Sequence, residues 1–148
     1  MSRVLIVIGS KSDQEYADIC AKQLAAFHIE CSIEVTSAHR HPARTSELTA
    51  QAAANGFEVI IAMAGLSAAL PGVSAAHSNL PVIGVPLPAA LDGLDALLAV
   101  TQMPPGIPVA AVGIGKPGAK NAAILAARIL ALKHDEIAKA LKAHRDSL

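Results

Sequence analysis

Short runs rich in β-branched residues alternate along this chain with longer segments in which apolar residues return every three or four positions. The short runs predict strands, which cover residues 4–8, 30–36, 59–63, 82–86 and 109–113. The first run is apolar at every position, which is typical of a strand buried on both faces of a parallel sheet.

The longer segments predict helices, which cover residues 13–27, 42–54, 71–77, 92–101, 120–132 and 135–145. Ser12 followed by Glu15 three residues later is a capping-box pattern, and it predicts the start of the first helix. Pro42 suits the first turn of the second helix, and Asn55-Gly56 is a typical helix end.

Strands and helices alternate throughout, with short connections and neither an internal repeat nor a long linker. This order predicts βαβ units with right-handed crossovers. We therefore predict an α/β fold with one domain over residues 1–148. It has a doubly wound, three-layer αβα arrangement around a five-stranded parallel sheet.

The composition favours an oligomer. Hydrophobic residues make up 53% of the 148 residues but aromatic residues only 2%, so small aliphatic side chains must fill the core. The mean hydropathy of +0.46 is high for a small monomer, and large exposed apolar patches usually mark interfaces. The alternative is that abundant alanine alone raises this value. We expect an oligomer in which the C-terminal helix of residues 134–148 packs on other subunits.

Charge, cysteine content and hydropathy exclude several classes of protein. The formal net charge is zero, and no basic run is present, which argues against binding of nucleic acid. Cys20 and Cys31 lack CxxC spacing and are interpreted as buried thiols of a reducing compartment. No run approaches the ~20 apolar residues of a membrane helix, and residues 10–13 interrupt the first apolar run too early for a signal peptide. We therefore expect a cytoplasmic protein that makes no contact with a membrane.

Residues 37–42 join the second strand to the second helix and carry a hydroxyl, an imidazole and a guanidinium. Open α/β folds bind their ligands at this edge of the sheet, where the carboxyl ends of the strands meet. The guanidinium of Arg40 suits a phosphate group, and the imidazole of His39 can exchange protons near neutral pH. The alternative is a polar loop with two surface histidines.

Two further loops are candidates for contact with a ligand. Residues 9–13 combine hydroxyls with a helix start, which can hold a phosphate, but they form no P-loop or GxGxxG motif and could be a plain cap. Residues 64–72 are nearly all small and apolar, so their backbone N–H groups could approach a ligand, with Ser67 as the one polar side chain. The proline-containing loops are expected to form rigid walls, and they cover residues 86–92, 102–108 and 115–118.

Metal and covalent chemistry lack support in the sequence. His39 and His41 have no acidic or cysteine ligand at a useful spacing. No GxSxG motif is present, and neither cysteine has a histidine beside it. We therefore expect no metal site and no covalent nucleophile.

Six segments, taken in order, carry a family resemblance: Gly9-Ser10-Lys11-Ser12-Asp13, Ser37-Ala38-His39-Arg40 and residues 64–72, 91–95, 102–108 and 121–123. They closely resemble the N5-carboxyaminoimidazole ribonucleotide mutase / aminoimidazole ribonucleotide carboxylase family of purine biosynthesis, over residues 3 to about 133. The resemblance implies a flavodoxin-like sheet and a homo-octamer with active sites formed where subunits meet. It also implies an aminoimidazole ribonucleotide substrate, handling of CO2, and no metal or organic cofactor.

The resemblance also assigns roles to residues. His39 matches the general acid/base of the family, and Ser37 and Arg40 match its phosphate-binding pair. The residues that match its ribose-phosphate contacts are Ser10, Ser12 and Asp13. The further positions expected to bind substrate are Gly9, Ala38, Gly65, Leu66, Ser67, Ala69 and Leu70.

Two branches of the family differ in the source of the carboxyl group. The mutase branch usually has Gly-Gly-Ala-Ala-His-Leu-Pro-Gly where this chain has residues 65–72, so Ala69 stands in place of a histidine. Ser67 and Ala69 resemble the carboxylase branch, whereas Arg40, the Leu-Pro-Gly ending and residues 102–104 resemble the mutase branch. By the number of matching motifs we predict a mutase, which moves the carboxyl group of its substrate from the amine to C4 through released CO2.

Three alternatives stand beside the mutase. A carboxylase would add CO2 directly to aminoimidazole ribonucleotide. A non-catalytic nucleotide-binding relative would have lost its chemistry with the histidine that Ala69 replaces, although Ser37, His39 and Arg40 are intact. An electron carrier of the flavodoxin type is disfavoured, because none of the few aromatic residues lies in a loop suited to stacking on a flavin.

Overall fold

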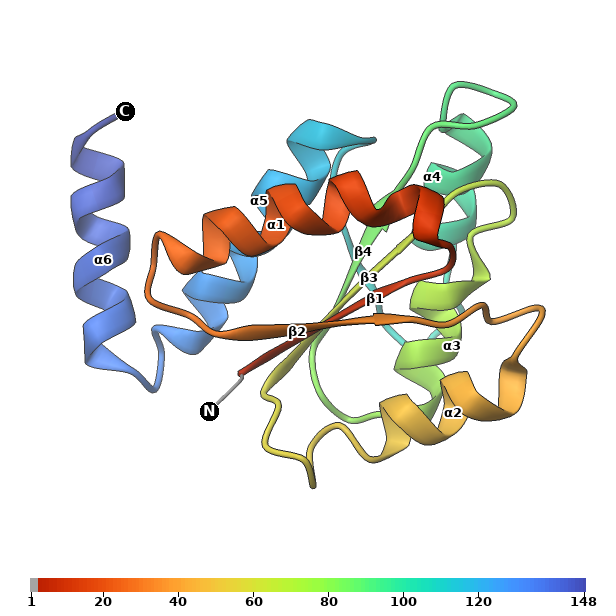
Figure 1. Ribbon diagram of the computed structural model, residues 1–148, viewed down its shortest axis with the longest axis horizontal. Helices are drawn as coiled ribbons and strands as arrows, with labels where there is room; N and C mark the ends of the chain where they lie inside the picture. The colour runs from red at the N-terminus through yellow and green to blue at the C-terminus, as the bar shows by residue number, and fades with distance from the viewer. Residues whose placement is uncertain (1–2) are drawn as a thin grey trace.

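The computed structural model of this chain describes residues 3–148. Its strands are β1 (Val4–Ile8), β2 (Cys31–Val35), β3 (Val59–Ala64), β4 (Val82–Pro86) and β5 (Ala110–Ala111). Its helices are the short 3-10 helix η1 (Lys11–Asp13), α1 (Gln14–Ala25), α2 (Pro42–Ala50), α3 (Ala69–His77), α4 (Leu94–Thr101), α5 (Lys116–Leu130) and α6 (Asp135–Asp146). The strands form one sheet, with α1 and α5 on one side and α2 and α3 on the other (Figure 1).

The sheet has the strand order β2-β1-β3-β4-β5, and every neighbouring pair is parallel. The chain passes from β1 to β2 on one side and then returns to β3 on the other side of β1, so the direction of winding reverses between β1 and β3. All residues of β1, β3 and β4 are buried, as expected for strands covered by helices on both faces. The predicted doubly wound, three-layer α/β fold is confirmed.

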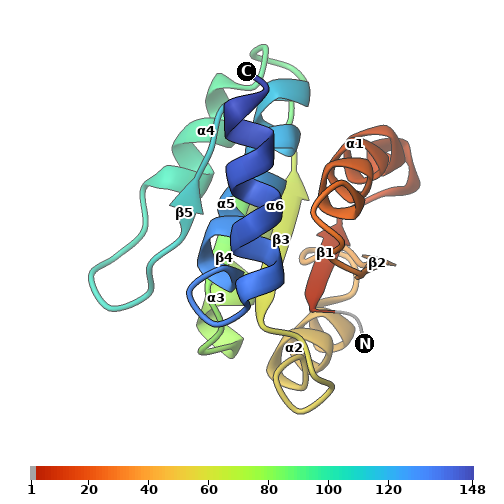
Figure 2. The same ribbon diagram turned by 90° about the vertical axis from the view of Figure 1, so that its left-hand side faces the viewer.

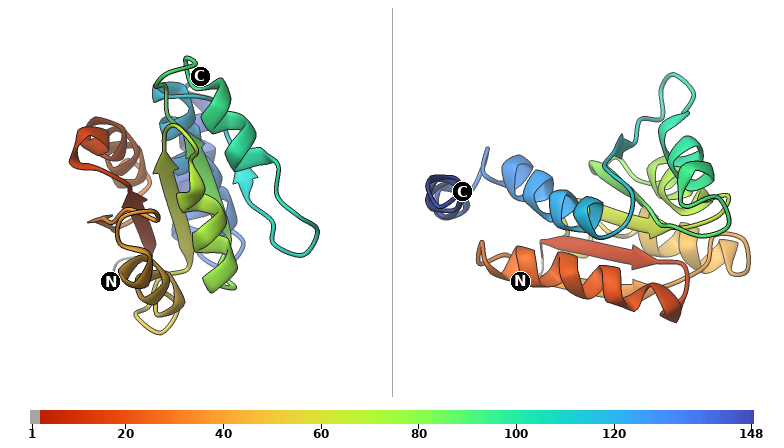
Figure 3. Two further views of the ribbon diagram at one scale, coloured as in Figure 1. Left: turned by 90° about the vertical axis from the view of Figure 1, so that its right-hand side faces the viewer. Right: turned by 90° about the horizontal axis from the view of Figure 1, so that it is seen from above.

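Two hydrophobic cores lie on the two faces of the sheet, because side chains alternate in direction along each strand. In β1, Val4, Ile6 and Ile8 belong to the core that includes α1 and α5, whereas Leu5 and Val7 belong to the core that includes α3 and α4. The alanines that α5 contributes to the first core are Ala119, Ala122, Ala123, Ala126 and Ala127. These small side chains let α5 lie close to the sheet and beside α1 (Figure 3).

The strand predicted over residues 109–113 is shorter in the structure. Among the described residues, Ala110–Ala111 form the part of this segment that pairs with β4 as a strand, and just beyond them the Val112 N–H donates to the Gly84 carbonyl (3.1 Å). β5 lies at the edge of the sheet, and β4 ends in Pro86, which has no N–H to extend the ladder. Alanine also favours strands less than β-branched residues do.

Several helix boundaries differ from the prediction. α2 ends at Ala50, and turns continue from there to Gly56, whose φ of +87° is the left-handed conformation expected of a helix-end glycine. α3 already begins at Ala69, and α5 already begins at Lys116. Pro117 lies in the first turn of α5, where its missing N–H leaves no partner unsatisfied and its fixed φ suits the helix.

The capping-box prediction at Ser12 is wrong. Ser10 caps η1 instead, because its Oγ accepts hydrogen bonds from the Ser12 N–H (3.3 Å) and the Ser12 hydroxyl (3.0 Å). α1 begins after Asp13, whose side chain makes no capping hydrogen bond. Glu15 is free of the cap and pairs with Lys116 at the start of α5 (2.8 Å).

A close backbone contact at Gly118 supports the start of α5. A Cβ at this position would lie 1.6 Å from the Gly113 carbonyl oxygen, and a backbone atom cannot swing away as a side chain does. We expect Gly118→Ala to lower the free energy of unfolding by about 3 kcal/mol, measured by urea denaturation. Helix propensity alone predicts the opposite sign, a gain of roughly 1 kcal/mol.

Gly113→Ala is the matched control for this substitution, because a Cβ at Gly113 would meet nothing within 4 Å. We expect it to change the free energy of unfolding by less than about 0.5 kcal/mol. Equal free energies of unfolding for G118A and G113A would contradict the destabilising effect expected from the close contact at Gly118.

The C-terminal helix α6 packs on its own chain through one face. Ile137 is buried, and the ring of His144 meets the ring of Phe27 edge-on, with centroids 5.3 Å apart. Figure 2 shows α6 outside α5, and Figure 1 shows it beyond the amino ends of the strands. Its outer face carries mostly charged residues, and its packing on other subunits stays a prediction.

A cluster of charges at Glu58 joins the amino edge of the sheet to the start of α6. The Glu58 carboxylate accepts hydrogen bonds from His134 Nε2 (2.9 Å) and Lys133 Nζ (3.3 Å), and Arg3 lies 4.0 Å away and pairs with Glu136 (3.0 Å). Burial raises the pKa of Glu58, but the hydrogen bonds from His134 and Lys133 outweigh it and hold the pKa below its ordinary value.

This depressed pKa predicts a pH dependence of stability. A carboxylate with a lowered pKa stabilises the fold above the ordinary value of 4.5, and this stabilisation is lost as the pH falls below it. We expect Glu58→Gln to cost about 1 kcal/mol at neutral pH and to flatten the loss of stability between about pH 5 and pH 3. Glu47→Gln, at an exposed glutamate of α2, should change neither the stability at neutral pH nor its loss on acidification. The same dependence of unfolding free energy on pH in the two variants would contradict the prediction.

Candidate active site

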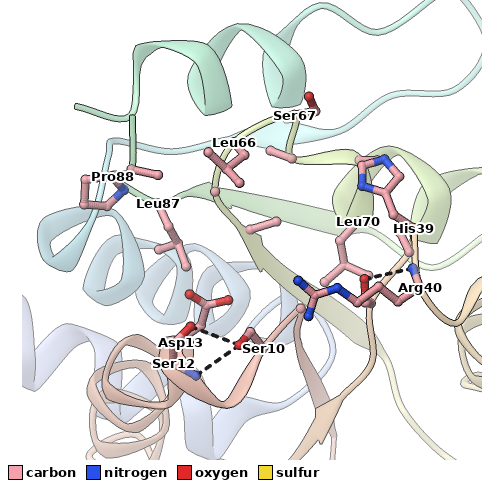
Figure 4. A pocket seen from close by; sticks show the side chains of 18 residues that line it. Ser10, Ser12, Asp13, His39, Arg40, Leu66, Ser67, Leu70, Leu87 and Pro88 are labelled. Atoms are coloured by element: carbon pink, nitrogen blue, oxygen red, sulfur yellow. Dashed lines mark hydrogen bonds between the residues drawn. The ribbon is translucent and has the colours of Figure 1, made fainter. Parts of the chain in front are cut away.

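A cavity of about 490 Å³ opens at the carboxyl ends of the strands. It lies over β1 and β3, where the direction of winding reverses, which is where doubly wound sheets bind their ligands. Figure 4 shows side chains from four strand-to-helix connections directed towards this space. The topology alone therefore makes it the leading candidate for a ligand site.

All of the site residues predicted from the sequence line this cavity. They come from three connections, and they are Gly9, Ser10, Ser12, Asp13, Ser37, Ala38, His39, Arg40, Gly65, Leu66, Ser67, Ala69 and Leu70. The other lining residues were not predicted to bind substrate, and they are Ala64, Ala68, Leu87, Pro88 and Ala89. The last three follow β4 and belong to the loop 86–92, which was predicted to form a rigid wall.

The connection after β1 contributes two hydroxyls and one carboxyl. The Ser12 hydroxyl donates to Ser10 Oγ, and the Asp13 N–H donates to the Ser10 carbonyl (3.0 Å). These two hydrogen bonds hold the residues in one short turn. Burial raises the pKa of the Asp13 carboxyl, and a hydrogen bond from the Ser10 backbone opposes this shift. A half-buried carboxyl beside two hydroxyls is suited to hydrogen bonding with the hydroxyls of a sugar.

The connection after β2 presents His39 and Arg40. Ser37 Oγ accepts a hydrogen bond from the Arg40 N–H (3.1 Å), so the segment turns tightly and both longer side chains extend outward. In Figure 4 the guanidinium of Arg40 is directed across the cavity towards Ser10. A planar set of donors beside a serine hydroxyl matches the oxygens of a phosphate group.

The connection after β3 forms an apolar, strained wall. Leu66 (φ +55°) and Ala68 (φ +25°) both adopt positive φ, which is costly for residues other than glycine and is concentrated at functional sites. The Ala68 N–H donates to the Gly65 carbonyl (3.0 Å), and a Cβ on Gly65 would lie 3.3 Å from the Leu87 carbonyl oxygen. This wall brings backbone close to the cavity and offers little that could hold water.

Two of the three loops predicted to form rigid walls do not line this cavity in the chain. Residues 102–108 connect α4 to β5, so they lead into a strand at the amino edge of the sheet. Gly106, Ile107 and Pro108 line a separate hollow there with Pro81 and Val82. Residues 115–118 do not line the cavity either. They support it from behind, because the Gly115 N–H donates to the Pro86 carbonyl (2.9 Å).

The described part of the chain offers neither a cluster of metal ligands nor a helix that could span a membrane. Within residues 3–148, no three histidine, cysteine, aspartate or glutamate side chains gather where they could hold a metal ion. None of the helices in this range combines the length and apolar character that crossing a membrane requires.

Comparison with known proteins gives one consistent result. A family model described as AIR carboxylase matches residues 3–148. The N5-carboxyaminoimidazole ribonucleotide mutase of Pyrococcus abyssi is 51% identical over 100% of this chain and 84% of its own, and that of Escherichia coli K12 is 47% identical over 92% and 81%. The solved structure of Treponema denticola PurE superposes with a TM-score of 0.90 at 34% identity, covering 99% of this chain and 91% of that one. The chain therefore belongs to the AIR carboxylase family.

Proposed function

We propose that this protein is an N5-carboxyaminoimidazole ribonucleotide mutase of purine biosynthesis, an isomerase that moves the substrate carboxyl group from the exocyclic amine to C4 of the imidazole ring. The observation that carries the proposal is one cavity that joins His39, Arg40 and the Ser10–Asp13 turn in a chain about half identical to proteins of that name.

The sugar and phosphate of the substrate match two of the three connections. Arg40 and the Ser37 hydroxyl hold the phosphate, since Ser37 Oγ accepts the Arg40 N–H and keeps its own proton to donate. Ser10, Ser12 and Asp13 bind the ribose from the other side of the cavity. Together these contacts place the imidazole ring between His39 and the apolar wall.

His39 transfers the proton in both halves of the reaction. Its imidazolium donates a proton to the exocyclic nitrogen as the C–N bond of the carbamate breaks, which leaves a free amine and CO2. C4 then attacks CO2 and becomes tetrahedral while it still holds its hydrogen. The neutral imidazole removes that hydrogen as a proton, so His39 ends protonated, as it began, and no proton is gained or lost overall.

The apolar wall retains the CO2. Leu66, Ala69 and Leu70 line the cavity, and their aliphatic side chains carry no group that could bind water or donate a proton to CO2. Alanine occupies position 69, where the mutase branch usually has histidine, and among residues 3–148 of one chain His39 is the only histidine that lines this cavity. One residue therefore carries both proton transfers.

Exposed leucines support assembly into a homo-octamer. Leu91, Leu94 and Leu98 are each more than half exposed, and Leu94 and Leu98 are one helical turn apart on α4. Leu66, at the mouth of the cavity, is also more than half exposed. We infer that copies of the chain cover these side chains and close the site, that α6 packs on other subunits, and that the enzyme works in the cytoplasm.

A comparison of carboxyl donors tests the proposed function. Purified protein is supplied either with N5-carboxyaminoimidazole ribonucleotide or with aminoimidazole ribonucleotide and bicarbonate, and the C4-carboxylated product is measured. We expect rapid conversion of the carbamate at low substrate concentration. Conversion of only the second mixture would identify a carboxylase instead, and binding without conversion of either would identify a non-catalytic relative.

A further inference from the structure

A buried threonine lies directly beneath the segment that carries His39 and Arg40. Thr45, in the first turns of α2, has no exposed surface. Its Oγ1 lies 2.9 Å from Thr36 Oγ1, 3.2 Å from the Ser37 carbonyl oxygen and 3.0 Å from the His41 carbonyl oxygen. This hydroxyl therefore touches the end of β2 and both ends of the segment.

The proton count fixes the direction of these bonds. A hydroxyl has one proton and two lone pairs, and a carbonyl oxygen can only accept. Thr45 must therefore donate its proton to the Ser37 and His41 carbonyls, which share it, and accept the proton of Thr36. Thr36 is itself nearly fully buried, so no water replaces either partner at low cost.

We propose that Thr45 is a positioning residue for His39 and Arg40. Ser37 and His41 lie on either side of these two residues, and the carbonyls of Ser37 and His41 both contact the Thr45 hydroxyl. The His41 N–H also donates to the Ser37 carbonyl (2.9 Å). His39 and Arg40 are themselves exposed, and the Arg40 N–H bonds to Ser37 Oγ at one end of the segment. The inference rests on the proposed function, since it assigns Thr45 to the geometry of that proton transfer.

Thr45→Val tests this role, because valine keeps the shape of threonine and removes the hydroxyl. The Ser37 and His41 carbonyls keep their backbone partners, the His41 and Thr45 N–H groups, but lose the hydroxyl that joins them, and the buried Thr36 hydroxyl loses its acceptor. We expect the segment to shift as a result. A displacement of about 1 Å can cost roughly 100-fold in rate, so we expect kcat to fall at least about 10-fold. Thr45→Ser keeps the hydroxyl and should restore most of the loss.

Thr49→Val is the matched control. Thr49 is also fully buried in α2, but its hydroxyl bonds only to helix carbonyls, those of Thr45 (2.9 Å) and Ser46 (3.3 Å). Its loss costs stability without releasing the segment, so kcat should stay within about two-fold of the unmodified enzyme. Thr45→Ala removes the same hydroxyl with a smaller side chain and replaces T45V in every comparison if T45V does not fold.

Amide hydrogen exchange separates this inference from the proposed function. The Arg40 and His41 N–H groups are hydrogen-bonded within the segment, and their exchange should quicken at least about 10-fold in T45V but not in T49V. An unmodified enzyme that converts no substrate would refute the proposed function and leave the exchange result valid. Equal exchange and equal kcat in T45V and T49V would overturn the role of Thr45.

Discussion

Replacing His39 by asparagine is expected to reduce kcat by a factor of about 10² to 10⁴, because asparagine keeps much of the size and polarity of the ring but cannot carry a proton. The loss should lie near the upper end of this range, since no other histidine among the described residues of the chain lines the cavity and could take over either proton transfer. The measurement is steady-state conversion of N5-carboxyaminoimidazole ribonucleotide. The KM should change little, because His39 contacts the reacting atoms and not the phosphate.

His41→Asn is the matched control for this prediction. His41 lies two residues further on, is exposed and does not line the cavity, so the same substitution there should leave kcat within about two-fold. Both variants should keep the circular dichroism spectrum and the size of the unmodified protein. If H39N kept a kcat within a few-fold of the unmodified enzyme, the acid–base role of His39 would be wrong.

Replacing Arg40 by methionine is expected to raise KM about 100-fold or more. Methionine keeps the length and apolar stem of arginine but removes the charged fork, and each charge-assisted hydrogen bond to a phosphate is worth roughly 1.5–3 kcal/mol. The change in kcat should be smaller, because the phosphate is bound in the ground state and the transition state alike. Substrates that lack the phosphate should bind the two enzymes equally well.

Arg128→Met gives the comparison for this second prediction. Arg128 is an exposed arginine in α5 and does not line the cavity, so its loss should leave KM within about two-fold. Opposite patterns in H39N and R40M, with loss of kcat in one and rise of KM in the other, would separate chemistry from binding within a single segment. A KM for R40M close to that of R128M would rule out Arg40 as the phosphate ligand.

The strands were predictable because their signal is local. β1 and β3 are apolar at every position, and burial on both faces is what such runs predict. The extent of β5 was not predictable, since it depends on Pro86 and Gly84 in the neighbouring strand, and the sequence does not state the register between them. The cap of the first helix was predicted wrongly because a short 3-10 helix and an α-helix begin with the same types of cap residue.

The part of the candidate site that follows the carboxyl ends of the strands was predictable, because these ends share one edge of the sheet. His39, Arg40 and the residues after β1 and β3 each follow a strand directly, so the fold alone brings them together. Residues 102–108 were misplaced because they precede a strand, and proline content says nothing about the edge at which a loop lies. The role of Thr45 was not predictable, since the sequence alone does not show that a threonine inside a predicted helix contacts the Ser37 and His41 carbonyls.

Retention of the carboxyl carbon during a single turnover tests the central claim most directly. N5-carboxyaminoimidazole ribonucleotide labelled with carbon-13 in its carboxyl group is converted in a large excess of unlabelled bicarbonate and carbonic anhydrase, which trap any CO2 that escapes. Migration within one closed cavity predicts that the C4-carboxylated product keeps nearly all of the label. A product whose label has fallen to the level of the bulk bicarbonate would contradict the claim.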